Sequence, residues 1–337
     1  MPTRGPGMVT ARQVAESLGV AVSTVGRALA DDPRISQRMK LMVREAAQRL
    51  GYVENLPAQM MRGGSSRLIG LMLPDIRNSF YATIADALSA CCDAAGYQLV
   101  VSLADNPEAE SRHVRQLASA RAAGIVIVPT PDPQPETCAM LARIPHVQLL
   151  RRVPQLSPAW FGIDDMECLR AGTGHLIARG HRRIAYIGGT GDYSTGADRL
   201  AGFRRAFAEA GLDPALATEH LGPPADPRFG ATATAALFAD AEPPSAIITG
   251  AVQLTGAVLQ AIAGRPHSDG REPAIVGFGD EPSFSWWRGE LTAIAMPIQE
   301  LAQACGGWLI ERLDTGAPIE AHSSMASAQL VEYRSDV

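Results

Sequence analysis

Few residues of this 337-residue chain have the types and spacings that catalysis needs. Gly188-Gly-Thr-Gly191 follows an apolar run, as a phosphate-binding loop does, but it lacks both the Gly-Lys-Ser/Thr of a P-loop and the spacing of a dinucleotide fingerprint. Asp164 and Asp165 form an acidic pair with no metal-ligating partner at a usable spacing. His175 and His181 flank a predicted helix end, where capping and surface contacts account for them. The sequence therefore predicts no enzyme and no bound metal or cofactor.

The composition is that of a globular protein with more than one domain. Hydrophobic residues make up 46% and charged residues 19% of the chain, enough to build two or three cores. The five cysteines have no paired spacing, which favours a reducing compartment. No apolar run reaches the roughly 18 residues of a transmembrane helix, and the first residues lack the apolar stretch of a secretory signal. We therefore expect a cytoplasmic protein that does not contact membranes.

Charge is distributed unevenly along the chain. Residues 1–64 carry nine of the 30 basic and five of the 35 acidic side chains, a net charge of +4, so the remaining residues carry −9 of the total of −5. A small basic segment joined to an acidic body indicates nucleic-acid contact by that segment alone. The alternative is that a net charge of +4 over 64 residues is ordinary variation along a chain and has no functional meaning.

The basic segment contains the start and stop signals of three short helices. Thr10 and Gln13 can form a capping box at the start of the first helix, and Gly19 ends it. A second helix is predicted over Val22–Leu29 after a tight turn, and a third over 36–50. Two short helices joined by a tight turn containing glycine are typical of a helix-turn-helix.

Residues 54–66 predict a short helix followed by a joint. Asn55 can cap this helix, Pro57 suits its first turn, and Gly63-Gly64 end it after fewer than ten residues. Such a short helix is marginal alone in water, and Gly63-Gly64-Ser65-Ser66 is typical of a flexible linker. A passive linker with an incidental helical turn is the alternative.

The rest of the chain predicts an α/β body. Apolar runs typical of strands occur at 69–74, 98–102, 124–129, 146–150, 183–188, 246–249 and 274–278, and amphipathic helices fit near 79–95, 108–121, 135–143, 166–179, 196–210, 229–239 and 253–263. Strands that alternate with helices indicate parallel sheets with helices on both faces. The alternation occurs in two halves, so we expect two doubly wound lobes with a ligand cleft at the carboxyl ends of their strands.

The head and body together resemble the lactose-repressor (LacI/GalR) family of bacterial transcription regulators. The resemblance is carried by Val9-Thr-Ala-Arg-Gln-Val-Ala15, Leu18-Gly-Val-Ala-Val-Ser-Thr-Val-Gly-Arg-Ala-Leu29, Leu73-Pro-Asp-Ile-Arg-Asn-Ser-Phe-Tyr81, His181-Arg-Arg-Ile-Ala-Tyr-Ile-Gly-Gly189, Thr195-Gly-Ala-Asp-Arg-Leu-Ala-Gly-Phe203 and Val276-Gly-Phe-Gly-Asp280. It implies an all-α helix-turn-helix head at 1–53, a hinge helix and linker at 54–66, and a periplasmic-binding-protein-like core for effector binding and dimerisation at 67–337.

The resemblance also implies which residues contact DNA. In that family the second helix lies in the major groove and its first residues contact base edges. The positions implied here are Arg12, Ala21, Val22, Ser23, Thr24, Arg27, Arg34 and Ser36 in the head, and Asn55, Ala58 and Met61 in the hinge. Val22 and Ser23 would read bases, with a thymine methyl group as the partner expected for Val22. Met61 would be the apolar wedge in the minor groove.

Two substitutions in the second helix depart from the family. Ala21 replaces the usual serine cap, a loss that typically costs ~0.5–2 kcal/mol. Gly26 replaces a serine within the helix, where glycine costs roughly 1 kcal/mol relative to alanine. We therefore expect a reading helix that is soft until DNA orders it.

The effector contacts implied by the resemblance are Phe80, Tyr81, Thr195, Arg199, Gln253, Asp280 and Trp286. Phe80 and Tyr81 would enclose the ligand, and Arg199 has the donor geometry for a carboxylate, a phosphate or a vicinal diol. Gly250-Ala-Val-Gln253 stands where the family commonly has an Asn-Asp pair, and Gly279 replaces an acid. A neutral monosaccharide is therefore no more expected than a sugar acid, a phosphorylated sugar or a nonsugar metabolite. A pocket that binds nothing is a further alternative.

These observations predict a homodimeric transcription regulator, a repressor, that binds a palindromic double-stranded DNA operator. A small carbohydrate-derived effector between the lobes would control its affinity for the operator. The alternative is a solute-binding protein of the same body fold without gene control, against which the fused head and the absent signal peptide argue.

Overall fold

The computed structural model describes residues 9–52, 66–265, 272–287 and 291–333. The chain forms two compact units, the head up to Ser66 and the body from Arg67 onward. The predicted hinge positions Asn55, Ala58 and Met61 lie outside the described residues.

The head is a bundle of three helices, as predicted. They are α1 (Ala11–Leu18), α2 (Val22–Leu29) and α3 (Gln37–Leu50). The capping box of Thr10 and Gln13 is present, and Gly19 ends α1 at a φ of +64°, a value that glycine adopts without strain. The core of this bundle consists of small and β-branched side chains: Val14, Ala15, Val25, Ala28, Val43, Ala46 and Ala47.

The first lobe of the body is a six-stranded sheet between two layers of helices. Its strands are β1 (Leu68–Leu73), β2 (Gln98–Leu103), β3 (Gly124–Ile127), β4 (His146–Leu149), β5 (Ala159–Ile163) and β11 (His322–Ala326), in the order β11-β5-β4-β3-β1-β2. Every pair in this sheet is parallel. Its helices are α5 (Ser79–Ala94), α6 (Pro107–Ser119), α7 (Pro135–Leu141) and α12 (Ile298–Thr315).

The second lobe repeats this architecture. Its strands are β6 (Ile184–Gly188), β7 (Ala217–Leu221), β8 (Ala246–Thr249), β9 (Ala274–Phe278), β10 (Leu291–Ala295) and β12 (Gln329–Tyr333), in the order β12-β10-β9-β8-β6-β7. Only β12 runs antiparallel within the described part of this sheet. Its helices are α8 (Asp165–Ala178), α9 (Ser194–Glu209), α10 (Pro227–Ala239) and α11 (Val252–Ala263), with short 3₁₀ turns η1 (Pro214–Leu216) and η2 (Pro282–Trp286).

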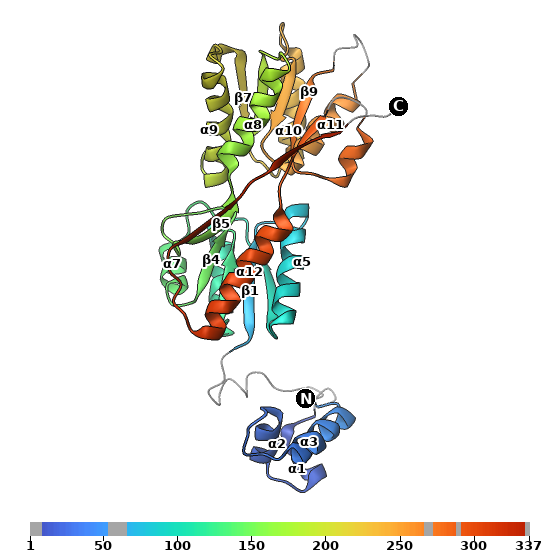
Figure 1. Cartoon of the computed structure of the whole chain (residues 1–337), viewed down its shortest axis with the longest axis vertical. Helices are drawn as coiled ribbons and strands as arrows, with labels where there is room; N and C mark the ends of the chain where they lie inside the picture. The colour runs from blue at the N-terminus through green and yellow to red at the C-terminus, as the bar shows by residue number, and fades with distance from the viewer. Residues whose placement is uncertain (1–8, 53–65, 266–271, 288–290, 334–337) are drawn as a thin grey trace, which may run out of the picture. The chain divides into compact units, whose positions relative to one another are not determined.

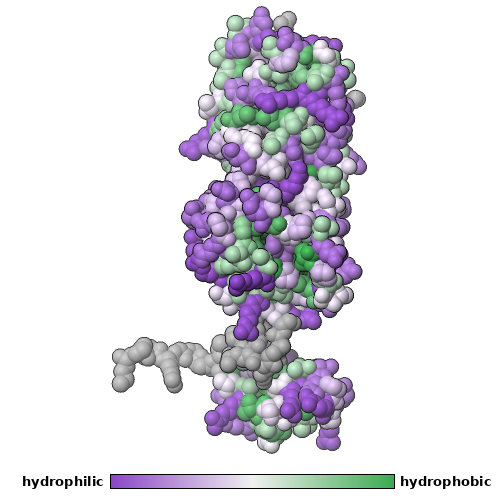
Figure 2. Space-filling model, turned by 90° about the vertical axis from the view of Figure 1, so that its left-hand side faces the viewer, coloured by the Kyte–Doolittle hydropathy of each residue, from purple (hydrophilic) through white to green (hydrophobic). Residues whose placement is uncertain are grey.

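The two lobes are joined by three crossings of the chain (Figure 1). The chain passes from β5 to α8, returns from β10 to α12, and crosses again between β11 and β12. Both lobes are therefore completed by segments near the C-terminal end of the chain, α12 and β11 in the first lobe and β12 in the second. The face of the body shown in Figure 2 mixes hydrophilic and hydrophobic residues over both lobes.

The predicted fold class is confirmed, but the list of elements was incomplete. The five strands β5, β7, β10, β11 and β12 and the helix α12 were not predicted. Three of these strands lie at sheet edges and expose much of their surface, so they lack the continuous apolar run of a central parallel strand.

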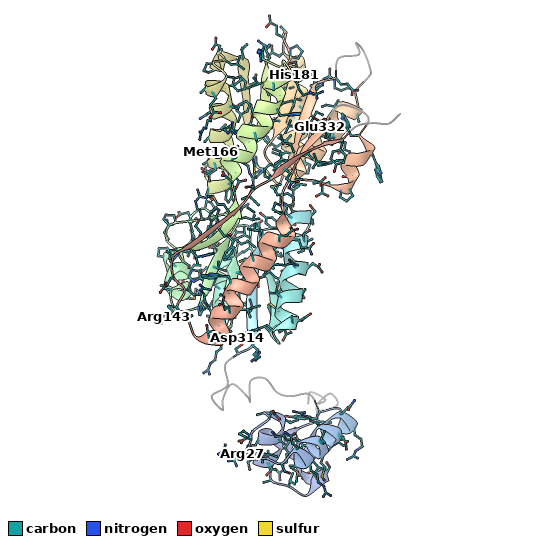
Figure 3. All side chains as sticks on the ribbon, in the orientation of Figure 1. Arg27, Arg143, Met166, His181, Asp314 and Glu332 are labelled. Carbon is teal, nitrogen blue, oxygen red and sulfur yellow. The ribbon has the colours of Figure 1, made fainter. Side chains whose placement is uncertain are left out.

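Close packing of α8 on α9 depends on Gly202. A Cβ atom at this position of α9 would overlap the carbonyl oxygen of Met166 on α8. Figure 3 shows Met166 among the side chains of this helix pair. Since the obstacle is backbone, the two helices would have to separate to accept a larger residue.

We expect Gly202→Ala to lower the free energy of unfolding of the body by about 1–3 kcal/mol because of this overlap. Urea unfolding monitored by tryptophan fluorescence measures it, since all four tryptophans lie in the body. The matched control is Gly174→Ala on α8, where a Cβ would meet no atom within 4 Å. That variant should have a free energy of unfolding roughly 0.5–1 kcal/mol higher than the unmodified protein, because alanine stabilises a helix relative to glycine. Equal stabilities for the two variants would contradict the packing argument.

Candidate functional site

The first turn of α2 presents its side chains to solvent. Val25 and Ala28 are buried in the core of the head, whereas Val22 and Ser23 are exposed and Thr24 is half-buried. Ala21 precedes the helix and provides no side-chain cap, as its type requires. The N-terminal amides of α2 therefore lack a side-chain acceptor from this position.

Three arginines predicted to contact DNA differ in their partners. Arg27 on α2 is exposed and points outward, and it makes no hydrogen bond or ion pair with the described residues (Figure 3). Arg12 pairs with Glu16 at 3.0 Å. Arg34 binds the Asp32 carboxylate through two nitrogens and holds the pKa of that carboxyl well below its usual range. Because both pairs are exposed, they are weak enough for a phosphate to compete with them.

Ser36 has a structural role at the start of α3. Its hydroxyl accepts a hydrogen bond from the backbone N–H of Met39 at 3.3 Å and so caps the helix. The side chain is exposed, which leaves it accessible to a further partner.

The body contains a cavity of about 100 Å³ between its lobes. Its walls are residues at the ends of β1, β4, β6, β8 and β9 together with the first turns of α5, α9 and α11. Parallel strands place their carboxyl ends at one edge of a sheet, so the two sheets turn these edges towards the same space. Five of the predicted positions line it: Phe80, Tyr81, Thr195, Arg199 and Gln253. A wider opening of about 740 Å³ adjoins the cavity, with Asp75, Arg151 and Tyr193 common to both.

Arg199 is the most firmly held polar group of the cavity. Its Nε donates to Oδ1 of Asp165 at 2.7 Å, its Nη1 donates to the carbonyl of Gly250 at 2.8 Å, and its guanidinium lies 3.9 Å from the centre of the Phe278 ring. The side chains of Arg199 and Asp165 are 16% and 3% exposed. Burial raises the pKa of the Asp165 carboxyl, and the charge of Arg199 opposes that rise. Nη2 has no partner among the described residues and is left for a ligand.

Polar contacts tie the two lobes together around the cavity. Asn78 of the first lobe donates to Oε1 of Gln253 in the second at 3.3 Å, and Ser79 donates to Glu281. On the other side, Arg152 pairs with Asp198 at 2.9 Å. A ligand in the cavity therefore lies between side chains that already connect the lobes.

Two family models match this chain. The model for bacterial regulatory proteins of the lacI family matches residues 10–55, and the model for a periplasmic binding protein-like domain matches residues 173–335. The HTH-type transcriptional regulator DegA of Bacillus subtilis is 27% identical over 87% of this chain and 88% of its own length. The ribose operon repressor of Escherichia coli is 27% identical over 91% of this chain and 93% of its own.

Residues 10–55 form a LacI-family DNA-binding domain, and relatives that match most of the chain are LacI/GalR-type regulators. The chain is a DNA-binding transcriptional regulator, in agreement with the prediction that it is not an enzyme. A crystal structure of the Lac repressor bound to ONPG has the same fold, with a TM-score of 0.81 and 24% identity over 98% of this chain and all of that one.

Two predicted effector contacts of this LacI-family regulator do not line the cavity. Trp286 lies on η2 with 84% of its surface exposed, and Asp280 is an exposed residue whose carboxylate accepts a hydrogen bond from Tyr333. Gly279, between Phe278 in the cavity wall and Asp280, has a φ of +96°. An effector contact by Asp280 or Trp286 stays a prediction.

The cavity wall also contains residues that were not predicted, among them Leu150, Arg151 and Tyr193. Leu150 and Arg151 follow β4, and Tyr193 precedes α9. The guanidinium of Arg151 lies 4.0 Å from the centre of the Tyr193 ring, so this contact also crosses between the lobes. The available signal was the position of Leu150 and Arg151 at the carboxyl end of a predicted strand.

Two other kinds of site are absent from the described residues. No group of three or more His, Cys, Asp or Glu side chains is placed to hold a metal ion in that part of the chain. In the same residues no helix is both long and apolar enough to cross a membrane.

The exposed position of Arg27 predicts a phosphate contact. We expect Arg27→Gln to weaken binding to nonspecific duplex DNA and to reduce the slope of log affinity against log salt concentration by about 1, the effect of one phosphate contact. Fluorescence anisotropy across a salt series measures this slope. The control is Arg143→Gln, which removes an exposed charge from the body. A slope equal to that of the unmodified protein would contradict the phosphate contact.

The buried pair predicts a large effect on stability. Arg199→Met should lower the free energy of unfolding by about 3–5 kcal/mol at pH 8, because it leaves the Asp165 carboxylate buried and unpaired. A raised pKa in the folded state means that this penalty grows as pH rises through the pKa of the unfolded chain and towards that of the folded one. The decrease in the free energy of unfolding caused by Arg199→Met should therefore be smaller at pH 5 than at pH 8.

The matched control is Arg204→Met on the same helix, which breaks the more exposed pair with Glu219. That change should cost at most about 1 kcal/mol. Urea unfolding at both pH values measures the free energy of unfolding of both variants. Equal decreases in the two variants would contradict the argument that burial makes the Arg199–Asp165 pair more important for stability.

Proposed function

We propose that this regulator is a repressor whose affinity for its operator is controlled by a small metabolite bound between the two lobes. The observation that supports this is the cavity, whose walls come from both lobes and which contains five predicted effector positions. A ligand that binds one lobe arrangement better than another shifts the protein towards that arrangement.

On the DNA side, α2 is the reading helix. Val22 and Ser23 contact base edges, with Thr24 and Arg27 on bases or phosphates, as their position at the exposed start of α2 supports. Arg12, Ala21, Arg34 and Ser36 lie next to the backbone of the duplex. In the hinge, which lies outside the described residues, the resemblance supports DNA contacts by Asn55 and by Ala58, which would face the minor groove beside the wedge Met61.

On the effector side, Phe80 and Tyr81 enclose the ligand, and Thr195, Arg199 and Gln253 donate hydrogen bonds to it. The ligand is carbohydrate-derived: a sugar, a sugar acid or a phosphorylated sugar. The similarity to the ribose operon repressor of Escherichia coli supports this class.

The regulator acts as a homodimer on a palindromic operator. A reading helix contacts one half-site, so two-fold symmetric protein and DNA match each other. The exposed apolar side chains Val101 and Leu103 on the edge strand β2 provide surface for pairing. A change in the angle between the lobes alters the spacing of the two heads and orders or melts the hinge helices.

The test is selection of fragments of the native genome by the purified full-length protein at ~150 mM salt, where nonspecific phosphate binding is weakened. We expect enrichment of a short palindrome and a change in its enrichment when small-molecule cell extract is added. A palindrome whose enrichment no extract changes would contradict effector control. No enrichment with or without extract would contradict sequence-specific binding by this head.

A further inference from the structure

The side chains that line the cavity offer a ligand more donors than acceptors. Nη2 of Arg199 and the guanidinium of Arg151 can only donate hydrogen bonds. The Oε1 of Gln253 already accepts a hydrogen bond from Asn78, so the group that Gln253 can offer a ligand is its amide nitrogen, which donates. The one carboxylate in the wall, Asp75, accepts through both oxygens from Arg77. A neutral polyol needs acceptors, because each hydroxyl also donates a hydrogen. The cavity is therefore better suited to a ligand that accepts.

The charge of Arg151 is not balanced by an ion pair. Asp165 balances the charge of Arg199, but no carboxylate lies within ion-pair distance of Arg151 in the part of the chain that the structure describes. Glu110 is the acid that interacts with it at longer range, and both oxygens of that buried side chain accept hydrogen bonds from Thr130. Arg151 thus brings to the wall of the cavity a positive charge that has no ion-pair partner among the described residues.

The backbone before Arg151 is held in an unusual conformation. Leu150 has a φ of +60°, in the left-handed region that a branched residue rarely adopts. Its N–H donates to the carbonyl of Phe161 and the N–H of Arg151 donates to that of Leu149, each at 2.7 Å. Strain of this kind is kept where a site requires it. Here the turn places an apolar side chain and a guanidinium side by side in the cavity wall.

We propose that the effector is a small organic anion, a carboxylate or a phosphate ester. Its charged oxygens bind Arg151 and Nη2 of Arg199, and its less polar part lies against Leu150 and Phe80. Arginine suits both kinds of anion because its nitrogens match two oxygens at once. This inference rests on the proposed function, since it names the chemical class of the effector and adds Arg151 as the residue that selects for charge.

The test is binding of matched anionic and neutral probes to the full-length protein without DNA. The anions are D-gluconate, D-glucose 6-phosphate, benzoate and phenyl phosphate, and the neutral partners are D-glucose and benzyl alcohol. Isothermal titration calorimetry measures their dissociation constants. We expect at least one anion to bind more than tenfold tighter than its neutral partner, and the carboxylate and phosphate members distinguish the two sources of charge.

Variants then test the role of Arg151. Arg151→Gln should weaken binding of the preferred anion at least tenfold, Arg151→Lys should fall between this variant and the unmodified protein, and the distant Arg143→Gln should leave the affinity unchanged. Preference for a neutral probe, binding of no anion, or unchanged affinity in Arg151→Gln would each overturn the proposal.

The same probes separate this proposal from the proposed function. Anion binding that leaves operator affinity unchanged would support the proposal and contradict effector control. If only a neutral probe changed the affinity for the operator, effector control would be supported and the proposal of an anionic effector would be contradicted.

Discussion

The buried pair of Arg199 and Asp165 links the cavity to the connection between the lobes. Asp165 is the first residue of α8, directly after the chain leaves β5 and enters the second lobe. Its partner Arg199 lies on α9 and turns its free nitrogen towards the cavity. Two charges removed from water in this way must keep their geometry, because separating them leaves each without compensation. Under the proposed function, a ligand bound to Arg199 would therefore be coupled through Asp165 to the start of α8, the first element after this crossing between the lobes.

The core of the head is built differently, from small side chains. Its fully buried residues in the described part of the chain are valines and alanines, with Tyr52 packed against them, and α2 begins at Ala21 without a side-chain cap. A helix with this start and with Gly26 in its middle has little stability beyond what packing of Val25 and Ala28 provides. Specific DNA contacts would then contribute to folding as well as to recognition, so the strength of operator binding depends on how well bound DNA orders α2.

The sequence predicted the parts of the fold that have a strong local signal. Central strands such as β8 are continuous apolar runs, and the cap of Thr10 on α1 is a local motif. Edge strands such as β7 and β12 are polar and half-exposed, so only their pairing with a neighbour identifies them. In the site, five residues that line the cavity were inferred from family motifs. Asp280 and Trp286 were inferred in the same way but do not line it, because a motif fixes the order of residues and not which side chains face a cavity.

The contacts that join the lobes explain how a small ligand could have a large effect. Arg152 and Asp198 remain partly exposed, and an exposed pair of this kind contributes at most about 1 kcal/mol. The stacking of Arg151 on Tyr193 adds a similar amount, ~0.5–1 kcal/mol at an exposed site. Because these two contacts are weak, losing them would add little to the energy difference between two lobe arrangements. Under the proposed function, an effector would then shift the populations of these arrangements by its difference in affinity for them.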